Sequence, residues 1–109
     1  MTLKEVADLI ASCGFTWRYS HFSQIPNSPY IVYYFPSEND IHADNVNFVN
    51  RRQLFIELFT KSKDIASETI IEGKLKEAGL SWYKQTDFLK DEKLFQTTYE
   101  LEVIINGNE

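Results

Sequence analysis

The stretch Gln53–Leu80 constrains the fold most, because it changes from strand periodicity to helix periodicity with only a short turn between the two. In its first part, alternate aliphatic residues are expected to point into a core: Leu54, Ile56 and Leu58. In its second part, Asp64 fits an N-cap and Gly79 fits the residue that ends a helix. Between these positions, apolar residues recur at helical spacing: Ile65, Ile70, Ile71, Leu75 and Ala78.

The other face of the same strand carries Phe55, Glu57 and Phe59. Two aromatic rings around a carboxylate are too apolar for a face that meets only water, so these residues mark a candidate association surface. For Glu57, an outward position facing Arg51 or a lysine is favoured over a general-acid role. A general acid needs a cleft and a second carboxylate, and the sequence indicates neither.

The N-terminus predicts a helix over about Thr2–Cys13. Thr2 and Glu5 fit a capping box, apolar residues follow at helical spacing, and Gly14 is the expected residue after the helix. Cys13 is interpreted as a small core residue and not as a nucleophile, because no histidine or other base is fixed beside it.

Four further segments have strand patterns. Phe15–Phe22 and Tyr30–Phe35 have strand composition, and the two prolines of Ser23–Pro29 require a loop between them. Beyond the second helix, Ser81–Phe88 reads as a strand, followed by a charged turn. Leu94–Ile105 then alternates between apolar and polar residues over a long strand with one buried and one wet face.

The expected order of elements is α-β-β-β-α-β-β, in one domain over residues 1–109. This order predicts an α+β fold with a mixed, mostly antiparallel sheet and two helices packed on one face. The connection from the third strand through the second helix to the fourth strand is too long for a hairpin, so we expect a crossover. The opposite face of the sheet is then left without a helix.

Composition excludes several classes of function. The net charge of −5 argues against nucleic acid as a specific partner, because phosphate binding needs a basic patch. No apolar run is long enough to span a membrane. The single cysteine excludes an internal disulfide and indicates a reducing compartment. Eight Phe, six Tyr and two Trp exceed what a small core takes, so some are expected at an interface.

The segment Ser37–Asn47 is polar and predicts a long loop. It carries Asp40, His42 and Asp44 in alternation, and these residue types can bind metals. Three ligands on one loop with no fourth in view favour a solvated loop instead. A loop of this length between strands is more often a functional arm than an idle linker.

Recognisable catalytic motifs are missing. The sequence has no glycine-rich phosphate loop and no GxSxG, CxxC or HExxH pattern. His21 and His42 are its only histidines, and neither stands in a recognisable arrangement with a nucleophile or a carboxylate pair. We therefore expect no enzymatic activity and no cofactor.

A further pattern spans several segments: Pro29–Tyr33, His42–Asn45, Leu54–Lys61 with Lys63 and Asp64, Glu92–Phe95, and Thr98–Glu100. In this pattern, which extends over nearly the whole chain, the protein resembles the small tail-completion proteins, or tail terminators, of long-tailed bacteriophages and prophages. The matching motifs are structural and not catalytic.

The resemblance implies a ring, commonly of six subunits, on the head-proximal end of the phage tail tube. Such a ring stops tube growth and offers a surface to the head connector. The implied partners are other copies of the chain, the tail tube protein and a head connector or neck protein. The implied location is the tail–neck junction of the virion, after synthesis in the host cytoplasm. The implied fold, a sheet with helices on one face, agrees with the periodicity.

Two alternatives stay open. The first is another phage neck component, such as a head-closure or connector protein. The second is a monomeric cytosolic binding module, for example an immunity protein that caps an enzyme in a one-to-one complex. An enzyme would require a metal bound at His42 with Asp40 or Asp44.

The candidate contacts with neighbouring subunits or the tube lie on the Ser37–Asn50 arm and the following strand. The only adjacent arginines begin this strand; they are interpreted as a solvated strand start or as a salt bridge to an acidic neighbouring subunit. The candidate interface residues are Asp40, His42, Asp44, Arg51, Arg52, Phe55, Glu57 and Phe59.

Overall fold

The computed structural model of the chain describes residues 1–36 and 50–106. Its elements follow the expected order α-β-β-β-α-β-β. Their bounds are α1 (Leu3–Ala11), β1 (Thr16–Tyr19), β2 (Tyr30–Tyr34), β3 (Asn50–Thr60), α2 (Ile65–Glu77), β4 (Tyr83–Leu89) and β5 (Leu94–Ile105).

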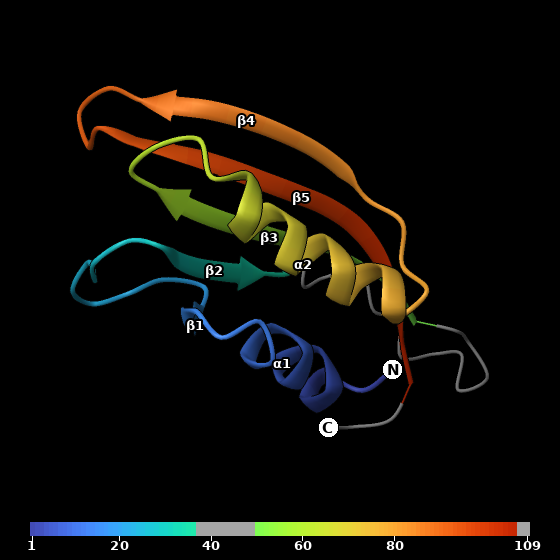
Figure 1. Cartoon of the computed structure of the whole chain (residues 1–109). Helices are drawn as coiled ribbons and strands as arrows, with labels where there is room; N and C mark the ends of the chain where they lie inside the picture. Colours follow the sequence, from blue (N-terminus) through green and yellow to red (C-terminus); the bar gives the residue numbers. More distant parts are fainter. Residues whose placement is uncertain (37–49, 107–109) are drawn as a thin grey trace.

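The five strands form one mixed sheet in the order β1-β2-β3-β5-β4. β1 and β2 are parallel, and the other three pairings are antiparallel. Both helices lie on the same side of this sheet (Figure 1). The α+β fold with a mostly antiparallel sheet and two helices on one face is confirmed. The crossover is also confirmed, because β5 lies between β3 and β4 in the sheet.

The core lies between the helices and the inner face of the sheet. The alternation in β3 is confirmed, since Leu54, Ile56 and Leu58 are all buried. β5 contributes its alternate residues to the same face, from Thr97 to Ile105. The helices add four buried aliphatic side chains: Val6, Ile10, Ile71 and Leu75.

The first helix has the expected capping box. The Thr2 hydroxyl accepts the backbone N–H of Glu5 at 3.1 Å, and the Glu5 carboxylate accepts the N–H of Thr2 at 2.8 Å. The helix ends at Ala11, and Gly14 takes a φ of +89°, which glycine adopts without strain. Cys13 is buried against the core, as expected, and burial raises the pKa of its thiol.

The ends of three strands, β1, β2 and β4, differ from the sequence prediction. The expected strand Phe15–Phe22 stops at Tyr19, because Ser20 takes a φ of 74° that lies outside the β region. In contrast, β4 continues to Leu89, one residue beyond the expected end, because its last residues pair with the start of β5.

The face of α2 that meets the sheet was only partly predicted. Ile71 and Leu75 are fully buried, but Ile65 is 62% and Ile70 is 44% exposed. Ala78 is exposed as well, just beyond the helix. The buried positions in the first half of the helix are instead polar: Ser67 and Glu68. The spacing of apolar residues therefore predicted a buried face of α2 that is rotated relative to the observed one. It could not predict that a carboxylate is buried, because the lysines that pair with it come from other elements.

Adjacent isoleucines in α2 allow a matched test of this orientation. Ile71→Ala is expected to lower the free energy of unfolding by about 3 kcal/mol, because it leaves a cavity in the core. Ile70→Ala removes a half-exposed side chain and is expected to cost less than about 1 kcal/mol. Urea unfolding of both variants checks this, and equal losses would mean that the helix faces the sheet differently.

Candidate functional site

The sheet face opposite the helices, here called the open face, carries the candidate site. The register places Tyr34 beside Phe55, Val32 beside Glu57, and Tyr30 beside Phe59. On the other side of β3, the same face continues through Glu100, Thr98 and Gln96 of β5. Both helices lie on the other side of the sheet (Figure 1). Because side chains alternate along a strand and the residues between these ones belong to the core, all of these residues point away from α1 and α2. Phe55, Glu57 and Phe59 therefore share one surface, as the sequence predicted.

Aromatic rings cover the β2–β3 half of the open face. Tyr30 and Phe59 stack with ring centroids 4.7 Å apart, and Tyr34 lies 5.4 Å from Phe55. Phe22, from the loop after β1, meets the ring of Tyr30 edge-on at 5.4 Å. Tyr30 is consequently buried although no helix covers it, while Phe55 and Phe59 stay half-buried. Five aromatic side chains thus gather on this half of the open face.

Glu57 lies half-buried at the centre of this aromatic surface. The Tyr34 hydroxyl donates a 3.0 Å hydrogen bond to its carboxylate. Burial raises the pKa of Glu57, and hydrogen bonds from Tyr34 and Gln96 offset only part of that effect. The pKa of Tyr34 is in turn raised to about 12, by burial and by its bond to Glu57.

The prediction that Glu57 faces Arg51 or a lysine is wrong. Arg51 lies on the same face of β3, but six residues along a strand separate the two by about 20 Å. All eleven lysines and arginines of the chain belong to residues that the structure describes, and none of them forms an ion pair with Glu57. Burial therefore raises the pKa of Glu57, since the carboxylate is held by neutral donors and by no lysine or arginine to offset that effect.

A groove of about 280 Å³ opens beside Glu57. Three segments build it: the loop after β1, the centre of β2 and β3, and the turn between β4 and β5. Its lining includes Phe22, Ile25, Tyr30, Phe59, Glu92 and Leu94, in addition to Glu57. The lining of the groove is thus mostly apolar, with two carboxylates and the imidazole of His21, and no single stretch of sequence contains it.

The two adjacent arginines lie on opposite faces of the sheet. Arg51 is exposed and lies 3.8 Å from the equally exposed Glu102, a contact that contributes little to stability. Arg52 is buried, with its guanidinium 4.6 Å above the ring of Phe35. The prediction that the arginines form a solvated strand start is therefore wrong for Arg52. Side chains alternate along a strand, so Arg52 points to the inner face of the sheet. A salt bridge to a neighbouring subunit stays a prediction for Arg51.

Asp40, His42 and Asp44 lie outside the described residues, as does the arm up to residue 49. Among residues 1–36 and 50–106, no group of three or more His, Cys, Asp or Glu side chains is placed to hold a metal ion. In the same part of the chain, no helix is long and apolar enough to cross a membrane.

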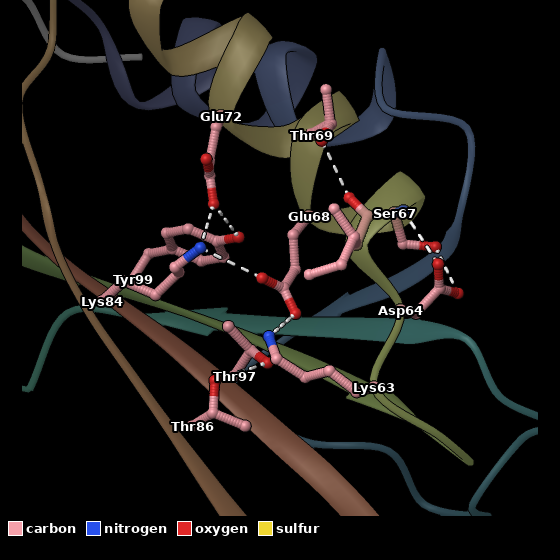
Figure 2. A network of polar contacts seen from close by, with 11 residues as sticks. Lys63, Asp64, Ser67, Glu68, Thr69, Glu72, Lys84, Thr86, Thr97 and Tyr99 are labelled. Atoms are coloured by element: carbon pink, nitrogen blue, oxygen red, sulfur yellow. Dashed lines mark hydrogen bonds and ion pairs between the residues drawn. The ribbon is translucent and has the colours of Figure 1, made fainter.

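A polar network on the opposite side of the sheet ties α2 to the strands, and Figure 2 shows it from close by. Lys84 of β4 lies between two carboxylates of α2, at 3.0 Å from Glu68 and 2.8 Å from Glu72. Lys63, from the turn before α2, also pairs with Glu68. The buried Tyr99 donates a 2.9 Å hydrogen bond to Glu72. Four segments thus meet at two acidic side chains.

Every charge of this network has a partner, so the network is structural in character. Glu68 is only 2% exposed. Burial raises the pKa of Glu68, but hydrogen bonds and charges from Lys63 and Lys84 together lower it below its usual value. This network was not predicted from the sequence. A signal was present, because Lys84 alternates with Trp82 and Thr86 on the inner face of β4.

Removing the inner carboxylate tests how much the network stabilises the fold. Glu68→Gln is expected to lower the free energy of unfolding by about 2 kcal/mol at pH 7, because two lysines lose their buried partner. The loss is limited because both lysines are themselves partly exposed to water. Glu77→Gln, the same change at an exposed position near the end of the helix, is expected to cost less than about 0.5 kcal/mol. Because the folded-state pKa is lowered, the difference should shrink as the pH falls below about 4.3 toward that pKa. A pH-independent difference would contradict the charge argument.

The same substitution at Glu57 is expected to act in the opposite direction. Glu57→Gln removes a charge that burial disfavours and keeps an oxygen to accept the Tyr34 hydroxyl, so the free energy of unfolding should rise at pH 7. Because the folded-state pKa is raised, the gain should disappear as the pH falls through it and wild-type Glu57 becomes neutral. Denaturant unfolding at pH 7 and pH 4 measures both, and a loss of stability at pH 7 would contradict the expectation.

A comparison with models of known protein families finds no match for this chain, and a comparison with curated proteins finds none.

Proposed function

We propose that the chain is a structural assembly protein of a long-tailed bacteriophage or prophage. In this role it forms a ring on the head-proximal end of the tail tube, stops tube growth and joins the tail to the head. Two kinds of support favour it: the resemblance of the sequence to tail-completion proteins, and a fold of the kind that this resemblance implies.

The open face is the observation that carries the proposal. Half-buried rings of Phe55 and Phe59 flank a carboxylate there, and both helices lie on the other side of the sheet. Interfaces are enriched in aromatic residues, which contribute large contact areas with little loss of side-chain freedom. A catalytic role has no comparable support in the described residues, because their inner carboxylates are engaged with lysines and Tyr99.

The first test is the assembly state, measured by light scattering after size-exclusion chromatography over a concentration series. We expect a discrete closed oligomer near six subunits, because a ring closes at a fixed number. If the free chain is monomeric, the proposal requires it to bind the ends of purified tail tubes. A chain that stays monomeric and ignores tube ends would contradict the proposal. A one-to-one complex with an enzyme would favour the immunity-type module.

Variants of the open face test the assigned surface. Phe55→Ser and Phe59→Ser are expected to abolish either assembly or tail joining, and retention of both activities would contradict the assignment. Tyr83→Ser is a second variant of the open face. Because Tyr83 is 81% exposed, this substitution should change the surface without affecting folding. Phe88→Ser is the matched control, since Phe88 is 51% exposed on the helix side of the sheet. Thermal unfolding of each variant separates lost contacts from lost folding.

The neck-protein alternative differs in what happens without the chain. If the protein stops tube growth, its removal should give tubes of uncontrolled length. If it only connects a finished tail to the head, its removal should give tails of normal length that lack heads. Electron microscopy of particles made without the protein distinguishes these two outcomes.

A further inference from the structure

Glu57 is an acidic group that forms no ion pair with a lysine or arginine of this chain. None of the described lysines or arginines pairs with Glu57, and the segments outside the described residues 1–36 and 50–106 contain no lysine or arginine. Glu68, in contrast, receives two lysines of the chain itself. A lysine or arginine that pairs with Glu57 must therefore come from another molecule.

We propose that the groove beside Glu57 binds the guanidinium group of an arginine side chain from a different protein that docks on the open face. This inference deepens the proposed function and rests on its docking role. It assigns the open face to a partner other than a second copy of the chain.

The walls of the groove suit a flat cation. Phe59 and Phe22 flank the buried ring of Tyr30 on two sides, one stacked and one edge-on. Aromatic faces attract a guanidinium group, which can also stack on them. The same cluster already holds one guanidinium, because Arg18 lies 5.5 Å from the centroid of Phe22. Arg18 does not line the groove, so the position beside Glu57 stays free for an incoming side chain.

The charges of the groove favour a cation from a basic partner. Glu57 lines one part of the groove and Glu92 another. Glu92 lies near enough to Tyr30 to act on it, since its charge adds to burial in raising the pKa of the Tyr30 hydroxyl. With a net charge of −5, a second copy of the chain would bring like charges to this face, whereas a basic surface would be complementary.

Arginine fits the groove better than lysine does. A carboxylate that accepts hydrogen bonds only from Tyr34 and Gln96 retains acceptor capacity for a second pair of donors. A guanidinium supplies two parallel N–H donors to a carboxylate and stacks on a ring at the same time, whereas an ammonium is a compact and strongly hydrated charge. A volume of about 280 Å³ admits one long side chain and not a bulky ligand.

The test is an NMR titration of the labelled chain with N-acetyl-arginine amide, compared with N-acetyl-citrulline amide, which has the same shape without the charge. We expect saturable shifts at the backbone amides of Phe22, Tyr30, Glu57 and Phe59, and binding of the citrulline compound weaker by about tenfold. Equal binding of the two compounds, shifts elsewhere, or no shifts up to the solubility limit would overturn the proposal.

Matched variants assign the site to Glu57. Glu57→Gln should weaken arginine binding by about tenfold, whereas Glu100→Gln, the same change at an exposed position on the same face, should leave it unchanged. Equal binding by the wild type and Glu57→Gln would overturn the assignment.

Light scattering separates this inference from the ring proposal. Glu57→Gln should leave the mass of the chain's own oligomer unchanged and weaken its binding to tail tubes or to the purified head connector. A changed oligomer mass would mean that a second copy occupies the groove, which contradicts the inference but not the ring. A chain that binds arginine in the groove but never forms a ring or joins a tail would contradict only the proposed function.

Discussion

The antiparallel pairing of β3 with β5 is the interaction on which the rest of the structure depends. It runs through eleven residue pairs, from Asn50 and Ile105 at one end to Thr60 and Phe95 at the other. The two strands supply most of the buried side chains of the inner face, and α2 follows β3 after a short turn. β2 and β4 then add one strand to each side of this pair. The helices can cover only the face on which the aliphatic residues of the pair gather.

This pairing also determines what the open face contains. Because side chains alternate along a strand, burial of Leu54, Ile56 and Leu58 forces the residues between them to the other side. A slip by one residue would bury Glu57 and expose three aliphatic side chains, so the register is strongly specified. Core packing thus decides which positions of the strands lie on the open face. It does not require aromatic residues at these positions, because the core lies on the other side of the sheet.

The sequence predicted most of the fold because its strands have clean periodicity. The buried faces of β3 and β5, the capping box of α1 and the crossover through α2 all follow from local patterns. The orientation of α2 could not be predicted in this way. Glu68 is buried because lysines from the preceding turn and from β4 reach it, and such contacts depend on elements that are distant in sequence. The groove was missed for the same reason, since the loop after β1 and the turn before β5 meet only in the folded chain.

The two carboxylates held within the fold differ in how their charge is balanced. Glu68 receives cations from its own chain, and its pKa is lowered; the ion pairs therefore favour the folded state at neutral pH. Glu57 receives only neutral donors, and its pKa is raised, so its charge opposes folding at neutral pH. A cost of this kind has no structural benefit within the isolated chain. The cation that we propose for the groove would offset this cost, and this reason favours a docking function for the open face over a purely structural one.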